Sequence, residues 1–437
     1  MHIMKWRCSF LFLVGAAPLL VAQENAVDYP YLAFDHKSID YIHGPVDDPV
    51  SRLAKRMEKG EAKLEYDPKW GYLPSLLKNL GINRDSQVLV FSKTSFQAPR
   101  ISPKKPRALY FNDTVAVGSV REGEVYEFAS LDPKQGAIYY TLDVDKTDHP
   151  EFLRRDMACM QCHMSPATLN VPGILVTSVY TSGDGMPYFR ANASVTDGRT
   201  AIMDRWGGWY VTGVTGSVTH NGNAVALNPQ QPSVLDRRDS QNLTSLAKKL
   251  DTSPYLEPTS DIVALMTLEH QTRMVNLMIR LGWETRIAMA DGKLEASEPR
   301  LAAVTEDLVT YMVFADEAHI WEPIEGVSTF TKTFPERGPR DKKGRSLRDF
   351  DLKTKMFRYP LSYMIYSEAF DALPQPAKDR VYRRLYEVLS GKDTSPKFAR
   401  LSAADRAAAL EILIDTKPSL PEYFKRSAPA AGDHLDR

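Results

Sequence analysis

Residues 159–163 form a short motif, Cys159-Met160-Gln161-Cys162-His163, with the spacing of a covalent haem attachment site. The two thiols can form thioethers with the vinyl groups on one edge of a porphyrin, and the imidazole that follows can bind the iron. The motif therefore predicts one c-type haem. Cys159 and Cys162 are the expected thioether residues and His163 the expected proximal iron ligand.

Other chemistries compete for this pair of thiols. A redox dithiol normally begins a helix after a strand, but the segment before Cys159 has only a weak helical pattern. A structural zinc site needs four ligands, and the chain has no second Cys-x-x-Cys pair. A plain disulfide is the third alternative. The adjacent His163 favours haem over all three.

The first 22 residues have the layout of a signal peptide. Lys5 and Arg7 precede an apolar run that ends near Leu20, and small residues lie before Gln23. The run is short for a membrane span, although an uncleaved anchor is the alternative. We expect export to the periplasm, loss of Cys8 with the signal, and no stable membrane span afterwards. Export agrees with the motif, because haem is attached to proteins outside the cytoplasm.

Composition describes an ordinary globular protein and excludes some partners. The 437 residues are 43% hydrophobic and 25% charged, which is enough chain for two or three domains. Lys and Arg together number 55, and so do Asp and Glu. Without a basic excess, nothing indicates a nucleic-acid partner.

The distribution of elements predicts an α+β fold. Short strand patterns separated by turn residues precede the motif, and helical patterns dominate after Asp261, whose carboxylate can cap a helix. The expected strands are 88–91, 108–111, 114–120, 125–128 and 137–142, and the expected helices lie within 49–80, from 261 onward, and over 361–370, 377–389 and 403–414. The expected segments are a signal peptide (1–22), a β-rich N-terminal domain with leading helices (23–148), a loop-rich haem module (149–235), a helical domain (236–428) and a loose tail (429–437).

Beyond the haem motif, the order of several segments resembles a group of exported bacterial single-haem proteins, labelled only as cytochrome c-domain proteins. The resemblance covers most of the mature chain. It implies haem and export, but the group has no settled activity to carry over. The segments that carry it are 88–94 (VLVFSKT), 110–113 (YFND), 159–163 (CMQCH), 205–213 (RWGGWYVTG), 220–223 (HNGN) and 268–271 (LEHQ).

The ligand on the second face of the iron decides between electron transfer and ligand chemistry. We expect His220, because it lies in a glycine-containing turn in the same module as the motif. His270 is an alternative that shares one helix face with several methionines, although such a stripe is usually core packing. Met203 is a further alternative, as is Met186, by analogy with small soluble cytochromes.

Arginine side chains are candidates to pair with the haem propionates, because a guanidinium group matches a carboxylate. Arg205 is the first choice. Arg154 and Arg155 flank the motif, and solvated surface charge explains them equally well.

These observations favour a periplasmic or extracellular cytochrome that passes single electrons to a redox partner protein. A haem enzyme, such as a peroxidase or small-molecule oxidase, is the alternative that chain length favours. A sensor or docking module is a third reading. The single attachment motif argues against a di-haem peroxidase, and no residue constellation forms an evident peroxide-cleaving site.

Overall fold

The computed structural model describes residues 27–191 and 193–425. The predicted signal peptide, with Cys8, and the predicted C-terminal tail lie outside the described residues.

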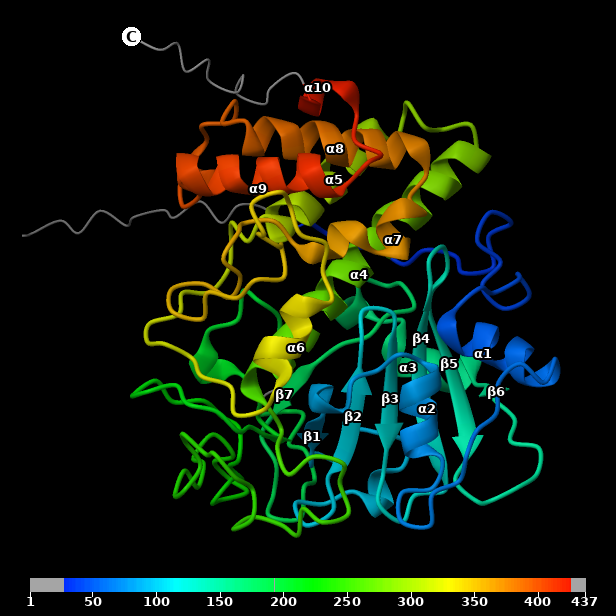
Figure 1. Cartoon of the computed structure of the whole chain (residues 1–437), viewed down its shortest axis with the longest axis vertical. Coiled ribbons are helices and arrows are strands. Elements are labelled where there is room, and N and C mark those ends of the chain that lie inside the picture. The colour runs from blue at the N-terminus through cyan, green and yellow to red at the C-terminus, as the bar shows by residue number, and fades with distance from the viewer. Residues whose placement is uncertain (1–26, 192, 426–437) are drawn as a thin grey trace, which may run out of the picture.

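An antiparallel sheet forms the centre of the molecule (Figure 1). Among the described residues it has seven strands in the order β6-β5-β4-β3-β2-β1-β9. The strands are β1 (Val88–Val90), β2 (Arg107–Phe111), β3 (Val115–Ser119), β4 (Val125–Asp132), β5 (Gly136–Asp143), β6 (Leu153–Arg154) and β9 (Trp209–Tyr210), while β7 (Thr177–Val179) and β8 (Ala193–Val195) form a separate hairpin.

The five expected strands of the N-terminal part are confirmed as β1 to β5. β6 and β9 come from the segment expected to be loop-rich, and β9 joins the sheet where Tyr210 pairs with Leu89 of β1. The sheet therefore contains strands from both sides of the expected boundary at residue 148.

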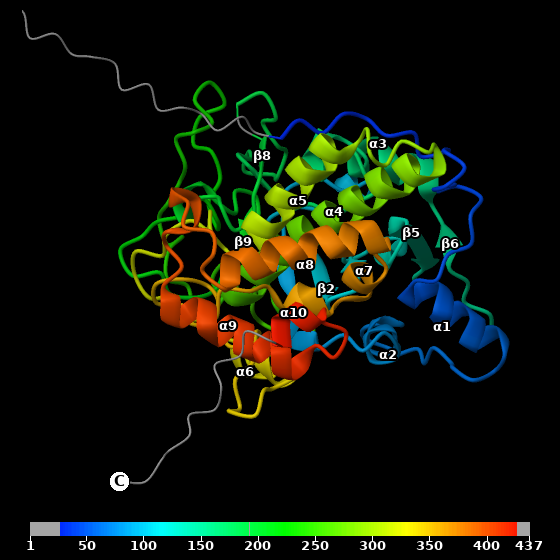
Figure 2. The same cartoon turned by 90° about the horizontal axis from the view of Figure 1, so that it is seen from above.

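The two faces of the sheet differ in their side chains. On one face Tyr126, Ser130 and Tyr140 are buried, and this face packs against the segments that carry α1 and α2. Figure 2 shows α1 and α2 on one side of the strands and α3 on the other. Since side chains alternate along a strand, the residues between these positions form the opposite face. Its central strands carry small, half-buried residues such as Ala116 and Ala129.

The longer helices follow the sheet in sequence, and several of them lie above it in Figure 1. The helices are α1 (Pro49–Glu58), α2 (Leu73–Asn79), α3 (Asp156–His163), α4 (Ile262–Ala290), α5 (Glu298–Met312), α6 (Phe330–Glu336), α7 (Glu368–Asp371), α8 (Gln375–Leu389), α9 (Ala403–Thr416) and α10 (Glu422–Lys425).

The expected start of the long helix is confirmed. The Asp261 carboxylate accepts hydrogen bonds from the amides of Val263 and Ala264, as an N-cap does. The helices expected over 377–389 and 403–414 correspond to α8 and α9. The segment 361–370 contains a short 3-10 helix and α7 instead of one helix, because Ser367 is extended and caps α7.

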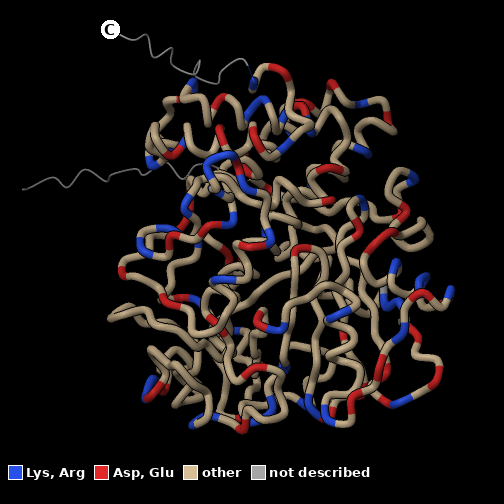
Figure 3. Tube along the Cα trace, in the orientation of Figure 1, with Lys and Arg blue, Asp and Glu red and all other residues tan. Residues whose placement is uncertain are grey.

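The structure thus confirms the antiparallel sheet and the helices of the expected mixed fold. In the part of the chain that the structure describes, no helix is long and apolar enough to cross a membrane. Figure 3 shows Lys and Arg interspersed with Asp and Glu along the chain.

Candidate haem attachment site

The haem motif lies on α3, which was not expected to be helical. Residues three and four positions apart are neighbours on a helix surface, so Cys162 and His163 each lie beside Cys159. Cys162 and His163 are consecutive and therefore point about 100° apart around the helix axis. Met160 is buried and anchors the helix to the core, whereas Cys162 is exposed and Cys159 is half-buried. The helix thus brings both thiols and the imidazole within two turns of one another, with Cys162 toward solvent and His163 toward Tyr139.

The His163 side chain is held in one orientation by a backbone clamp. Its Nδ1 lies 2.9 Å from the Gly173 carbonyl oxygen, and the Gly173 amide donates to the His163 carbonyl at 2.9 Å. A carbonyl oxygen only accepts, so Nδ1 carries the proton. The lone pair is therefore on Nε2, the atom that binds a metal in a histidine whose other nitrogen is hydrogen-bonded.

The loop that returns to His163 is tightly turned. Leu169 and Asn170 both adopt left-handed backbone conformations, with φ of 60° and 54°. The Thr168 hydroxyl lies 3.1 Å from the His163 carbonyl oxygen and 2.9 Å from that of Val171. These contacts fix the path of the chain between α3 and Gly173.

Helix α4 holds the loop that follows α3 through side-chain hydrogen bonds to the loop backbone. The Asn276 side-chain amide donates to the Ile174 carbonyl at 2.8 Å, and Arg280 donates to the Leu169 carbonyl at 2.9 Å. Gly173 lies so close to α4 that an added Cβ would be 2.3 Å from the Asn276 Oδ1. The position of the Gly173 carbonyl therefore depends on the absence of a side chain there.

The surroundings of His163 keep the imidazole neutral. Burial lowers the pKa of His163 below its usual range, which outweighs the opposite effect of the Gly173 carbonyl. The ring packs against Tyr139 of β5 with centroids 5.0 Å apart, and the Tyr139 hydroxyl donates to the Gly173 carbonyl at 2.8 Å. A neutral imidazole with a fixed orientation is a suitable metal ligand.

The face of the sheet beside His163 is lined by small residues. Two rows of residues cross β3, β4 and β5 on this face. One row is Ala116, Ala129 and Tyr139, and the row two residues further along the strands is Gly118, Glu127 and Thr141. An added Cβ at Gly118 would meet the Glu127 side chain at 3.4 Å, which confirms that both face the same side. Ala116 and Ala129 are half-buried, so this face is partly open beside the buried Tyr139. Two thiols and a neutral imidazole are the donor set that a c-type haem uses.

Arg205, the expected propionate partner, forms a buried ion pair with Glu269. Its Nη1 lies 2.8 Å from the Glu269 Oε2, and its other two nitrogens donate to the carbonyls of Thr200 and Gly198. Arg155, by contrast, lies on the α3 side of the sheet and donates from Nε to the Thr141 hydroxyl at 3.0 Å. Arg154 donates to the carbonyl of Tyr41.

The distal ligand candidates have different surroundings. His220 is buried against Trp206 with ring centroids 5.2 Å apart, and its Nδ1 accepts from the Gly222 amide at 3.1 Å. Burial lowers its pKa to about 3. Trp206 lies just before β9, whereas His163 packs on β5. β9 and β5 are five strand positions apart, about 24 Å at the usual spacing of about 4.8 Å.

His270 lies inside the helical part, with Nε2 2.7 Å from the Ser362 hydroxyl and its ring stacked on Phe314. Met203 and Met186 are exposed. Among the described residues, no hydrogen bond or ring contact joins any of these candidates to His163.

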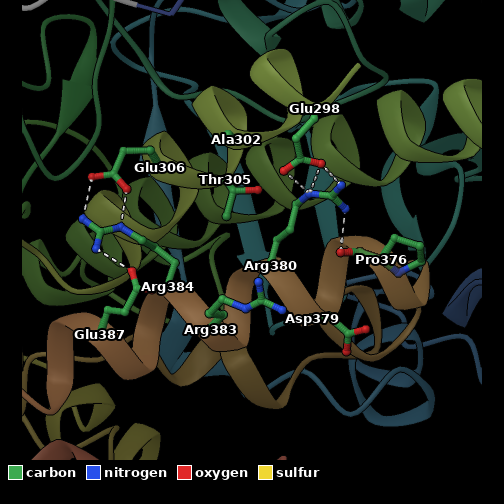
Figure 4. A pocket seen from close by; sticks show the side chains of 10 residues that line it. All are labelled: Glu298, Ala302, Thr305, Glu306, Pro376, Asp379, Arg380, Arg383, Arg384 and Glu387. Atoms are coloured by element: carbon green, nitrogen blue, oxygen red, sulfur yellow. Dashed lines mark hydrogen bonds and ion pairs between the residues drawn. The ribbon is translucent and has the colours of Figure 1, made fainter. Parts of the chain in front are cut away.

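Two other observations bear on alternative sites. A groove of about 570 Å³ lies between α5 and α8, lined by the ion pairs Arg380–Glu298 and Arg384–Glu306 (Figure 4). These charges compensate one another, and the groove is not part of the α3 surface. Within residues 27–191 and 193–425, no group of three or more His, Cys, Asp or Glu side chains could hold a metal ion.

No family model, no curated protein and no solved structure matches this chain.

Sequence reasoning did not find Gly173, Tyr139 or Asn276. The Val171-Pro172-Gly173 turn ten residues after His163 was the available signal for the clamp. Tyr139 and Asn276 gave none, because their approach to His163 depends on the register of β5 and the placement of α4.

Proposed function

We propose that the protein is a c-type cytochrome that transfers single electrons through one covalently bound haem. The observation that carries the proposal is the arrangement on α3: Cys162 and His163 both neighbour Cys159 on the helix, and the 2.9 Å contact to Gly173 leaves the lone pair of His163 on Nε2. Haem bound there would supply a one-electron ferric–ferrous couple.

The residues of the chain have separate roles in this proposal. Cys159 and Cys162 hold the porphyrin, and His163 binds the iron. The Gly173 carbonyl orients the imidazole and increases its basicity, as outer partners of metal-bound histidines do. Asn276 and Arg280 keep that carbonyl in place through the loop.

The optical spectrum tests electron transfer against the alternative. A low-spin, six-coordinate ferric haem indicates a closed site suited to electron transfer, whereas a high-spin haem that binds carbon monoxide or peroxide favours a haem enzyme or a sensor. We expect the low-spin spectrum. A high-spin spectrum in the purified wild-type protein would contradict an electron-transfer role.

Variants then identify the distal ligand. The sequence names His220 first, with His270 and Met203 as alternatives. Because β9 beside His220 lies about 24 Å from β5 beside His163, coordination by His220 requires the chain to rearrange when haem binds. The near-infrared band of methionine-bound ferric haem would exclude both histidines and direct attention to Met203→Ala. Without that band, His220→Ala should convert the haem to high spin, and an unchanged spectrum would transfer the assignment to His270.

The location and the partner are part of the same proposal. A haem-bearing protein of this kind would act in the periplasm and exchange electrons with another redox protein. Cell fractionation tests this directly. Processed protein in the periplasmic fraction agrees with the proposal, and unprocessed protein in the cytoplasm contradicts it.

A further inference from the structure

An ion pair on the small-residue face of the sheet has an incomplete set of partners. Arg107 of β2 donates from Nη1 to the Glu127 Oε2 on β4 at 2.6 Å. Among the described residues Nη1 is the only guanidinium nitrogen of Arg107 with a hydrogen-bond partner, and its Nε is buried without one. The remaining nitrogen, Nη2, has no hydrogen-bond partner among the described residues and, unlike Nε, is not fully buried, so it is the group through which Arg107 can bind a further anion.

Glu127 is built to remain a carboxylate. Burial alone would raise its pKa, but the charge of Arg107 and hydrogen bonds from Gln97 and Ser95 outweigh burial and hold the pKa of Glu127 below its ordinary value. The half-buried Glu127 carboxylate therefore accepts hydrogen bonds from Ser95, Gln97 and Arg107. Its ion pair with Arg107 holds the guanidinium group in one position.

The pair lies on the same side of the sheet as the haem motif. Both Arg107 and Glu127 act electrostatically on the His163 imidazole. β2 and β5 are three strand positions apart, about 14 Å at the usual spacing of about 4.8 Å. Small residues, among them Ala116, Gly118 and Ala129, occupy the strands between them.

We propose that Arg107, positioned by Glu127, binds a haem propionate, so that the porphyrin extends from α3 across the small-residue face of the sheet. The vinyl groups and the propionates lie on opposite edges of a porphyrin, and α3 supplies the thiols for the vinyl edge. The propionate edge must then lie away from α3. Arg155 lies at the start of α3, so it is too close to the thiols to bind the propionates. This inference rests on the proposed haem.

Reduction potential tests the role of each charge. A positive charge beside the haem favours the ferrous state, so Arg107→Gln should lower the potential. Glu127→Gln removes a negative charge and should raise it. Arg107→Lys retains the charge and should fall between wild type and Arg107→Gln. Covalent haem staining and circular dichroism of each variant verify that haem and fold are retained.

A second ion pair supplies matched controls. Arg380 and Glu298 are paired between α8 and α5 (Figure 4), two helices that lie above the sheet in Figure 1. Arg380→Gln and Glu298→Gln change the net charge by the same amounts and should leave the potential unchanged.

Opposite shifts in the two Arg107–Glu127 variants, with unaffected controls, would support the inference. Unchanged potentials, or shifts of one sign in both variants, would overturn it. If Glu127→Gln does not fold, the comparison of Arg107→Gln with Arg107→Lys decides alone, and equal potentials in these two overturn the inference. Wild-type protein without covalent haem would instead contradict the proposed function.

Discussion

The Gly173 carbonyl is the residue-scale feature on which the proposed iron ligation depends most. It accepts from His163 at 2.9 Å and from Tyr139 at 2.8 Å, and Gly173 has no space for a side chain beside Asn276. The site therefore fixes its metal ligand through main-chain geometry rather than through a carboxylate partner.

Gly173→Ala should raise the reduction potential of the haem. The new methyl group would lie 2.3 Å from the Asn276 Oδ1, so the loop must shift and the hydrogen bond to His163 must weaken. A less basic imidazole favours ferrous iron. Redox titration measures the shift. Gly183→Ala is the matched control, since no atom lies within 4 Å of the added carbon. Equal reduction potentials of the wild type, Gly173→Ala and Gly183→Ala would contradict the role of the Gly173 carbonyl in orienting His163.

His270 gives a residue-scale prediction about acid stability. Burial lowers its pKa in the folded protein to about 3, from an ordinary value of 6.5. Between these values the unfolded chain binds the extra proton, so the stability that His270 contributes is lost as the pH falls below 6.5. His270 alone should reduce the free energy of unfolding by about 2 kcal/mol between pH 7 and pH 5.

Denaturant titration at the two pH values measures this loss. His270→Gln should be less stable than wild type at pH 7 but should lose about 2 kcal/mol less on acidification. His319→Gln, at an exposed position, is the control. An unchanged pH dependence in His270→Gln would show that His270 is not the group that titrates.

At the scale of elements, Asp261 joins two parts of the helical region. One carboxylate oxygen caps α4, and the other accepts from the amides of Val327 and Ser328 at 2.8 and 2.7 Å. Asp261→Ala should therefore cost more than a simple cap, about 2 to 4 kcal/mol of unfolding free energy.

Ser402→Ala is the comparison for that prediction, because Ser402 caps α9 at an exposed end with a single bond to the Asp405 amide. It should cost about 1 kcal/mol. Equal losses in the two variants, measured by denaturant titration, would show that the second set of bonds from Asp261 contributes nothing.

The elements also show what a single sequence can predict. Strands β1 to β5 and the start of α4 follow from alternation, turn residues and one capping aspartate. Helix α3 was missed because it has no apolar stripe at helical spacing and, among the side chains that the structure describes, buries only Met160 fully. β9 was missed because two residues gain strand geometry only by pairing with β1.

The same limit applies to the candidate site. The motif itself, with Cys159, Cys162 and His163, is visible in the sequence because its spacing is set by local chemistry. Arg107 and Glu127 are twenty residues apart in sequence, and they meet across β3 only through the register of three strands. Such contacts are tertiary, so no local pattern indicates them.

At the scale of the whole molecule, the helical part of the chain contacts the loop that positions His163. α4 reaches from the helical part to the loop behind His163, where Asn276 and Arg280 hold it one helix turn apart. The sheet packs against α3 through Tyr139, and α4 hydrogen-bonds to the loop after α3 through Asn276 and Arg280. Residues of the predicted haem module thus pair with β5 on one side and hydrogen-bond with α4 on the other.

Covalent haem attachment is the central claim, and intact mass spectrometry of the purified protein tests it most directly. We predict a mature chain that carries the mass of one haem, retained after extraction with acidified acetone. The Cys159→Ala, Cys162→Ala double variant should lack this added mass. A wild-type protein without it, or haem that extraction removes completely, would contradict the account.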